Sequence, residues 1–562
     1  MALRLGKPEL ALGLGGFVVA FSVTLTAIIV IRYQASDRAA ADRSSPVHVQ
    51  AGMDGHLTPA VLDRQWLTYS NRSTCADRSG GDGVSAVRLS SSQIAWFFSD
   101  SSLGPAGPRI GFSEQSGFVH NLVVMQTTRG SHSRLVTITG GHACAGASKP
   151  GRAVSVVSVA NAGGAANQRY WANDGLRIGS RVLRFYTRFE PGRVPFVPVG
   201  TVIADFPVRQ LARAGRGPAF GAVIRPRITK VPTYRPSGGG TPIVWGAALL
   251  RHGGMVYIYG WRSSDPTSLA RQCYLARVTA SRLEDISAWR FYGGGGRWAA
   301  RQHGAQPIAA DTNLSIDTGF SVVNAAGRYW LIEHAGGLGS PRIEAYPGPR
   351  PWGPFDTAAA VLLYRAPGIR LTEADRYQIM YEARAEPALS SRHTLVISYN
   401  VNSLAVTAGC IPITAFTNAV IQPRFIGVPR AVFGAAPSGT TRLATAAVDS
   451  HEDPPAASKH DPRWFDRWKY SGGCPPLHAV RNIAVTHTKG SILVRWRASG
   501  PGVRYRVYLR SPGSRYVLLR ITRTSSVALR KLVRGSRYQV LIVPENIDHR
   551  KGPGASITIK AR

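Results

Sequence analysis

Carboxylates stand at the ends of predicted strands in widely separated parts of this 562-residue chain. Asp82 opens the first strand of a predicted strand pair, and Asp100 closes the second strand in a Ser-Asp-Ser-Ser loop. A spacing of eighteen positions lets the chain run out and back, so both carboxylates should lie at the same end of the pair. Two neighbouring carboxyl groups can divide acid and base roles between them, which is what cleavage of a glycosidic bond requires.

Other polar and aromatic residues begin strands further along the chain. The predicted catalytic residues are Asp82, Asp100, Asp317 and Glu382, and the predicted substrate-binding residues include His120, Asn121 and Trp245. Each has a structural alternative: aspartates favour turns and loop caps, Glu382 could pair with Arg384, and His120 and Trp245 could be core residues. No spacing typical of a metal site occurs, so we expect no metal and no cofactor.

The elements that must position these residues are repeated strand pairs. Five divergent copies of one supersecondary unit, each of about four short strands, predict a five-bladed β-propeller. The alternative is a two-sheet β-sandwich with coincidental spacing. The pairs fall at residues 81–89 and 93–100, 170–174 and 182–186, 244–248 and 256–260, 317–323 and 329–333, and 381–384 and 395–400.

The predicted class is all-β, with one N-terminal transmembrane helix and a second, C-terminal β-domain. The pattern changes after Cys474, where short runs alternate as half-buried strands do. The predicted divisions are a membrane anchor at 1–35, a stalk at 36–60, the propeller at 61–432, a linker at 433–473 and the C-terminal domain at 474–562.

The N-terminal segment Leu10–Ile31 is uncharged and mostly apolar. As a helix, it would be about long enough to span the core of a bilayer. Basic residues flank it on both sides, so they do not decide its orientation. A retained signal anchor with the bulk of the chain outside the cell is favoured, and a cleaved signal peptide is the alternative. The predicted location is therefore the cell membrane, with a single span.

The chain carries 68 basic and 31 acidic side chains, a formal charge of +37. Such a charge attracts polyanions, including acidic wall polymers and anionic lipid. No compact basic cluster interleaved with aromatic residues stands out, which argues against nucleic acid as a partner.

Five cysteines are present. Cys75 could bridge to Cys144 across the first repeat, and Cys410 could bridge to Cys474, which would leave Cys273 unpaired. Such bridges would fit an oxidising compartment, and five buried thiols are the alternative, because pairing cannot be deduced from sequence.

Several motifs carry a family resemblance. They are Asp82-Gly83, Trp96 to Asp100, His120 to Val124, Pro351 to Pro354, and Ser398 to Ser403. Over about residues 65–430 the chain resembles a family of secreted five-bladed propellers common in actinobacteria, some of which are endo-D-arabinanases. The resemblance implies a glycoside hydrolase whose first-blade aspartates match Asp82 and Asp100.

The same resemblance adds Tyr399 and Asn400, from the Tyr-Asn-Val-Asn-Ser stretch, to the predicted substrate-binding residues. One departure concerns the fourth repeat. Related propellers often carry a carboxylate directly before a Phe-Ser pair, whereas Asp317 is displaced by two positions from that place before Phe320-Ser321. Substrate identity and activity depend on that difference.

The C-terminal part resembles a fibronectin type III domain. Trp496 stands where the core tryptophan of the second strand falls, and Leu532, Tyr538 and Asn546 match the tyrosine-corner region. Together these features predict a membrane-anchored, extracytoplasmic glycoside hydrolase acting on cell-envelope polysaccharide, arabinan or a relative. The alternative is an inactive propeller that binds wall glycan and carries a fibronectin-type spacer.

Overall fold

The computed structural model is all-β, as expected from the sequence. It describes residues 58–561 except 71–74, 105–116, 130–131, 145–150, 191–196, 218–221, 236–238, 265–269, 309–314, 336, 338–339, 367–377, 404–420, 435–478, 489, 498–502, 523 and 546–550. The predicted membrane segment, most of the predicted linker, and Cys410, Cys474 and Asn546 lie outside the described residues. Within the described ranges, no helix combines the length and apolar character needed to cross a bilayer.

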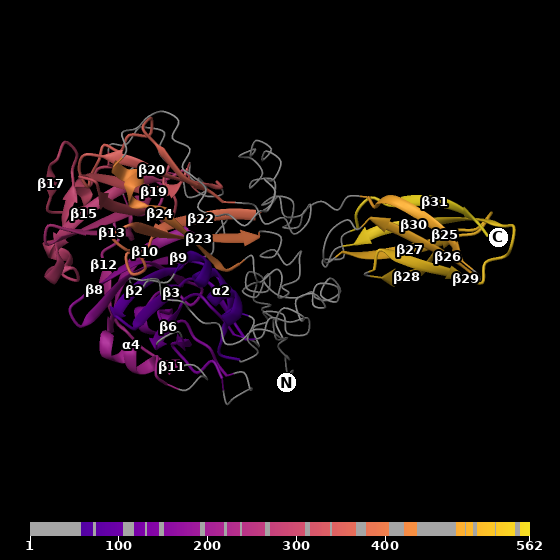
Figure 1. The fold of residues 1–562 in the computed structure, drawn as a ribbon, viewed down its shortest axis with the longest axis horizontal. Helices are drawn as coiled ribbons and strands as arrows, with labels where there is room; N and C mark the ends of the chain where they lie inside the picture. The colour runs from indigo at the N-terminus through magenta and orange to yellow at the C-terminus, as the bar shows by residue number, and fades with distance from the viewer. Residues whose placement is uncertain are drawn as a thin grey trace, which may run out of the picture.

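Five antiparallel sheets follow one another along the described part of residues 85–429, and each begins with one of the expected strand pairs (Figure 1). Their strands are β2 (Ser85–Ser90), β3 (Gln93–Phe98), β6 (Leu122–Arg129) and β7 (His132–Thr139), with β11 (Ala222–Val223) added in parallel; β8 (Arg169–Ile178), β9 (Arg181–Glu190), β10 (Val197–Pro207) and β12 (Arg227–Val231); β13 (Val244–His252), β14 (Met255–Arg262), β15 (Gln272–Thr279), β16 (Arg290–Tyr292) and β17 (Trp298–Ala299); β18 (Ser321–Ala325), β19 (Arg328–His334), β20 (Arg342–Gly348) and β21 (Val361–Arg365); and β22 (Gln378–Ala385), β23 (Thr394–Ser403) and β24 (Pro423–Pro429).

The first strands of neighbouring sheets contact each other in chain order, from β2 to β8, β13, β18 and β22. The last sheet returns to the first through side chains that bridge its end to β2. Glu386 Oε2 accepts a hydrogen bond from the backbone N–H of Ala86 at 2.8 Å, and Arg88 Nε donates to the carbonyl of Ala388 at 2.9 Å. Because the sheets cover one another face to face, strands such as β3 are buried along their whole length.

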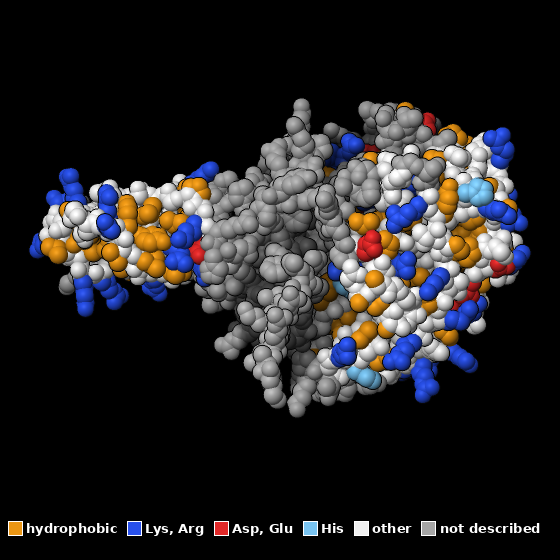
Figure 2. All heavy atoms as spheres, turned by 180° about the vertical axis from the view of Figure 1, so that it is seen from behind, with side chains coloured by type: hydrophobic (Ala, Val, Ile, Leu, Met, Phe, Trp, Pro, Cys, Tyr) orange, Lys and Arg blue, Asp and Glu red, His pale blue; other side chains and the backbone are white. Residues whose placement is uncertain are grey.

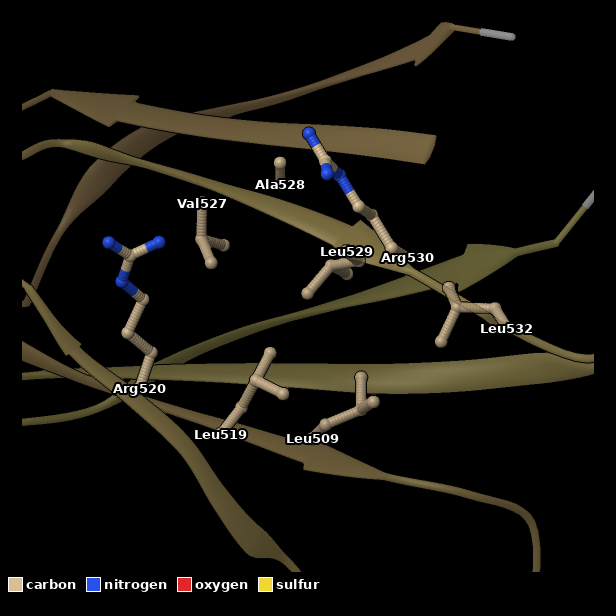
Figure 3. Close-up of a pocket in the computed structure, with 8 residues that line it drawn as sticks. All are labelled: Leu509, Leu519, Arg520, Val527, Ala528, Leu529, Arg530 and Leu532. Atoms are coloured by element: carbon tan, nitrogen blue, oxygen red, sulfur yellow. The ribbon is translucent and has the colours of Figure 1, made fainter. Parts of the chain in front are cut away.

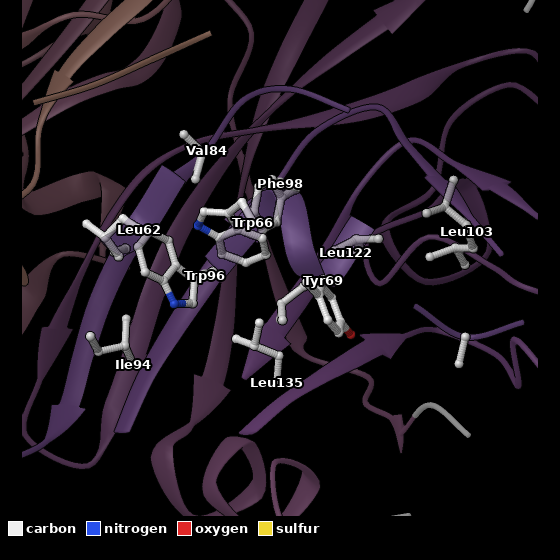
Figure 4. Packing of buried hydrophobic residues seen from close by; sticks show 14 of the residues in the cluster. Leu62, Trp66, Tyr69, Val84, Ile94, Trp96, Phe98, Leu103, Leu122 and Leu135 are labelled. Atoms are coloured by element: carbon white, nitrogen blue, oxygen red, sulfur yellow. The ribbon is translucent and has the colours of Figure 1, made fainter. Parts of the chain in front are cut away.

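Helix α2 (Pro59–Ser70) covers the first sheet, and the sequence analysis placed no helix there. Its Leu62, Trp66 and Tyr69 lie on one helix face and pack against Trp96 and Phe98 (Figure 4). The remaining short helices are α3 (Val159–Ala162), α4 (Val208–Ala214), η3 (Ala280–Arg282), η4 (Ile286–Ala288), η5 (Gln302–Gly304) and η7 (Arg430–Gly434).

A small sheet, of β1 (Arg78–Gly81), β4 (Ser101–Leu103) and β5 (Phe118–Val119), extends from the same region. Cys75 and Cys144 are joined in a disulfide with Cα atoms 5.7 Å apart, which confirms that predicted pair. Cys273 is a buried free thiol.

The C-terminal module, residues 479–561, contains two described sheets around a separate core. One sheet has the order β25 (Arg481–Thr488), β26 (Ser491–Arg497), β29 (Ser526–Arg530), and the other the order β28 (Val517–Thr522), β27 (Arg504–Arg510), β30 (Arg537–Glu545), β31 (Ala555–Lys560). Trp496 packs edge-on against Tyr505 in the core, with ring centroids 5.2 Å apart. The hydroxyl of Tyr538 accepts a hydrogen bond from the backbone N–H of Val533 at 3.0 Å.

Candidate active site

Asp82 and Asp100 lie side by side at one end of the first sheet. Asp82 precedes β2 and Asp100 follows β3, and the backbone N–H of Asp82 donates to the carbonyl of Asp100 at 3.1 Å. Glycines on both sides of Asp82 allow this approach, because a Cβ on Gly83 would lie 2.2 Å from Ser99 Oγ and a Cβ on Gly81 would lie 2.1 Å from the carbonyl oxygen of Asp100. The sequence-based expectation that the strand pair returns to the same end therefore matches the geometry.

The carboxylate of Asp100 is held by two side chains from different parts of the chain. The indole Nε1 of Trp171, on β8, donates to Oδ1 at 2.7 Å, and the Nδ1 of His120 lies 2.7 Å from the same oxygen. Within the described residues, Oδ2 accepts no hydrogen bond. A quarter of each side chain of the Asp100–His120 pair remains exposed to solvent.

The surroundings of Asp82 favour its protonated form. Burial and the negative charge of Asp100 raise its pKa to about 8, while the hydrogen bond from Tyr381 opposes that rise. The Tyr381 hydroxyl donates to Asp82 Oδ2 at 2.6 Å. Arg78 is also near enough to favour the carboxylate, but its Nη1 donates to Gln422 at 2.9 Å, and the described residues contain no ion pair between Arg78 and Asp82.

Glu382 reaches the same region from the fifth sheet. It lies in a bulge of β22 with a φ of 57°, a left-handed conformation that is unusual outside glycine. Its carboxylate accepts hydrogen bonds from Thr318 Oγ1 at 3.1 Å and Asn400 Nδ2 at 3.3 Å. Burial raises its pKa, and its charge contributes to the raised pKa of Asp82.

The ion pair that was the structural alternative for Glu382 is present, since Arg384 Nη2 lies 3.7 Å from Oε1. Arg384 is itself buried and donates through Nη1 to the carbonyl of Ala247, on β13, at 3.2 Å. Its positive charge also favours the carboxylate of Asp174, whose pKa is raised by burial. Arg384 thus links the first strands of the third and fifth sheets, β13 and β22.

Asp317 supports Glu382 rather than facing solvent. Its side chain is fully buried, and Oδ2 accepts a hydrogen bond from the backbone N–H of Glu382 at 2.7 Å. Oδ1 accepts from the backbone N–H of Thr318 at 2.6 Å. These contacts hold the strained backbone of Glu382 in place, so the structure does not support a role for Asp317 in direct contact with substrate.

Three predicted substrate-binding residues are buried, and their described contacts are with groups other than these carboxylates. Asn121 is buried and uses its amide on three backbone partners, accepting from the N–H of Val157 at 2.8 Å and donating to the carbonyls of Val157 and Tyr170 at 2.6 and 2.8 Å. Trp245 is fully buried against Trp289 and Phe291.

Tyr399 is buried in the core shared by the last two sheets and packs against Tyr364. Its neighbour Asn400 is also buried but reaches the site as a hydrogen-bond donor to Glu382. Of the predicted binding residues, His120 alone combines contact with a candidate catalytic carboxylate and partial exposure to solvent.

Two participants, Trp171 and Tyr381, were not predicted. Both lie inside strands that the sequence analysis identified, at Tyr170–Asp174 and Tyr381–Arg384. Their aromatic type at the first strand of a repeat was the available signal. The sequence could not show that the indole N–H of Trp171, in the second sheet, reaches Asp100, or that the hydroxyl of Tyr381, in the fifth sheet, reaches Asp82.

The arrangement supplies one carboxyl that is protonated at neutral pH beside one that is stabilised as an acceptor. Such a pair can donate a proton and deliver a nucleophile or base in one reaction. In the described ranges, no group of three or more His, Cys, Asp or Glu side chains could hold a metal ion. Glu114, a further carboxylate that falls between β4 and β5 in the sequence, lies outside the described residues.

Comparison with known proteins gives one family. Residues 63–430 match the profile described as "Domain of unknown function (DUF5005)". No curated protein matches the sequence. A Bacteroides ovatus structure provisionally assigned as a hydrolase is 18% identical over 65% of this chain and 88% of its own, with a TM-score of 0.47.

Two further solved structures match only a small part of the chain. A pair of fibronectin type III domains from chicken tenascin is 25% identical over 15% of this chain and 48% of its own, with a TM-score of 0.14. Domains d3–d4 of rat CD45 are 20% identical over 16% of this chain and 51% of their own, also with a TM-score of 0.14.

Proposed function

The chain belongs to the DUF5005 family, which it matches over residues 63–430, and on that premise we propose that it is a glycoside hydrolase with Asp82 as its proton donor. The observation that carries the proposal is the split between two adjacent carboxyl groups. Asp82 has a pKa raised to about 8, whereas Asp100 is held as a hydrogen-bond acceptor by Trp171 and His120.

In the proposed reaction, Asp82 donates its proton to the leaving glycosidic oxygen. Asp100 Oδ2 attacks the anomeric carbon or removes a proton from the attacking water. Trp171 and His120 orient the Asp100 carboxylate, and Tyr381 orients Asp82 through its 2.6 Å hydrogen bond. Glu382 and Asp317 are positioning residues, because the negative charge of Glu382 helps to keep Asp82 protonated.

We propose a five-bladed propeller for residues 61–432 and a fibronectin type III-like fold for residues 474–562. The five successive sheets, with first strands in contact and the last returning to the first, support the propeller. The two-sheet core with Trp496 and the hydrogen bond at Tyr538 support the C-terminal assignment. Under this arrangement, the first strands bring residues from distant repeats to one central region.

The proposed substrate is a cell-envelope polysaccharide, arabinan or a relative, outside the membrane. The family resemblance noted from the sequence supports the substrate class, and the apolar segment 10–31 supports a membrane anchor. The disulfide between Cys75 and Cys144 supports an oxidising compartment. We expect the full chain to fractionate with membranes, and recovery of the intact chain as a soluble cytoplasmic protein would contradict this location.

The test of function is release of oligosaccharides from a panel of wall polysaccharides by a chain of residues 45–562. Arabinan should be cleaved, and the same chain with Asp82→Asn should release nothing above background. Binding of a polysaccharide without release by either protein would favour the alternative, an inactive glycan-binding propeller. Asp82 is not paired with a buried arginine in the described residues, which favours the enzyme.

Tyr381→Phe should move the alkaline limb of activity to higher pH. Loss of the proton from Asp82 should abolish its role as acid, so kcat/KM should fall as the pH rises through about 8. The Tyr381 hydrogen bond favours the carboxylate form, and its removal raises the pKa further, by roughly one unit for a hydrogen bond to a charged group. The measurement is a pH profile of kcat/KM for both proteins.

The control is Tyr259→Phe, which removes a hydroxyl on β14, in the third sheet, that donates to the carbonyl of Pro351. That variant should keep the original profile. A limb that stays in place or moves to lower pH in Tyr381→Phe would show that the hydroxyl does not act on the proton donor.

A further inference from the structure

The C-terminal module carries an excess of positive charge that its own acidic groups do not balance. Residues 479–562 contain fourteen arginines and four lysines against one glutamate and one aspartate. The glutamate, Glu545, is buried and already paired with Arg504 at 3.1 Å and with Arg506. No acidic residue occurs between 479 and 544, so, apart from Arg504 and Arg506, the described cations of this stretch have no acidic partner within it.

One edge of this module exposes aliphatic side chains between those cations. Among the described strands β28 pairs with β27 alone, and its Val517, Leu518, Leu519 and Ile521 are 67%, 40%, 46% and 44% exposed. Val533, which follows β29, is 66% exposed. Exposed edge strands of this kind are normally covered or blunted, because they present both apolar side chains and unpaired backbone groups.

The gap between the two sheets opens at this edge. A cavity of about 160 Å³ lies between β28 and β29, lined by Leu509, Leu519, Leu529 and Leu532 (Figure 3). Arg520 and Arg530, both exposed, stand beside it on the two strands. Hydrophobic and basic side chains are intermingled over the visible surface of the module (Figure 2).

We propose that the β28 edge docks on an anionic lipid bilayer, with Val517, Leu518 and Leu519 in the interfacial layer and Arg520 and Arg530 on lipid phosphates. Apolar area inserted at the interface and attraction to anionic lipid are the two contributions that hold peripheral proteins on membranes. Both are present on this one edge.

The aliphatic side chains distinguish a bilayer from other anionic partners. A hydrophilic polyanion in water would contact the arginines but would gain little from covering valine and leucine. A second copy of the module could pair edge to edge, but it would bring an equally uncompensated positive charge against the first. A bilayer surface matches both the charge and the apolar character.

The test is co-sedimentation of a chain of residues 45–562 with vesicles. This chain retains every described residue and lacks the predicted membrane segment 10–31. It should bind vesicles of phosphatidylcholine mixed with phosphatidylglycerol and not vesicles of phosphatidylcholine alone. V517S/L518S and R520Q/R530Q should each lower the partition coefficient by about tenfold, since each removes one of the two contributions.

The matched control is R495Q/R497Q, which removes the same charge from exposed positions on β26, a strand that does not pair with β28 and pairs with β29 through residues 491–495. It should change the partition coefficient by less than about twofold, because the attraction of a cation to an anionic surface falls off within a Debye length. All variants touch exposed side chains, and near-ultraviolet circular dichroism checks that each is folded.

Three outcomes would overturn the proposal. If R495Q/R497Q weakens binding as much as R520Q/R530Q, attraction is spread over the module and no edge is specific. If V517S/L518S binds vesicles unchanged while the parent chain binds dextran sulfate equally well, the partner is a soluble polyanion. If the parent chain is a dimer that V517S/L518S converts to monomer, the edge is a contact between copies.

Discussion

Replacing Asp82 by asparagine should reduce polysaccharide turnover by roughly two to four orders of magnitude, the contribution of a general acid or base. The side chain keeps its size and polarity and loses its transferable proton. Folding should survive, because burial already favours the neutral form of Asp82 and the amide is neutral as well. The measurement is the rate of oligosaccharide release at a pH below 8, where the parent carboxyl is protonated.

Asp100→Asn should cause a loss of similar size for a different reason. The amide oxygen can still accept from Trp171, so the residue can keep its place, but the negative charge and the reactive oxygen are removed. The same change removes the charge that helps to raise the pKa of Asp82. The double variant should therefore be little worse than either single variant, as for residues that act as a unit.

Asp285→Asn is the matched control for both. Asp285 is an exposed aspartate beside Arg282 on the third repeat, remote in sequence from the candidate site. Its replacement should leave turnover unchanged. If Asp82→Asn or Asp100→Asn is folded and cleaves at the parent rate, that residue has no part in the mechanism.

Trp66→Ala should strongly destabilise the first repeat, costing about 3–5 kcal/mol of unfolding free energy. Trp66 is fully buried, and its ring meets Trp96 at 5.2 Å and Phe98 at 5.0 Å between centroids. Removal leaves a large cavity between α2 and the first sheet, because the surrounding strands are held by their own ladders and cannot close it. The measurement is the midpoint of urea unfolding with its slope.

Leu67→Ala is the control for this change, since Leu67 follows Trp66 on α2 and is 36% exposed. It should cost only about 0.5 kcal/mol. If the two substitutions lower the free energy of unfolding equally, the buried face of the helix and its packing against Trp96 do not stabilise the fold.

Short-range patterns in the sequence were enough to determine the strands and the meeting of Asp82 with Asp100. Alternation and apolar runs identify β2 and β3, and a short turn between them returns the chain to its starting end. Cys75 and Cys144 flank the same repeat and could be paired for a related reason. The helix α2 carried a weaker signal, Leu62, Trp66 and Tyr69 at helical spacing, within a segment that was divided between the predicted stalk and the start of the predicted propeller.

The tertiary structure alone decided which residues surround the two aspartates. Trp171 and two further residues, Tyr381 and Glu382, come from other sheets. A local sequence pattern does not indicate which strand ends of different sheets lie close together. Burial, which sets the pKa of Asp82 and removes Trp245 and Asn121 from the site, depends on the packing of all five sheets together. The sequence therefore determined elements and their local turns, whereas long-range packing determined protonation, exposure and partners, because these depend on residues that are distant in the chain.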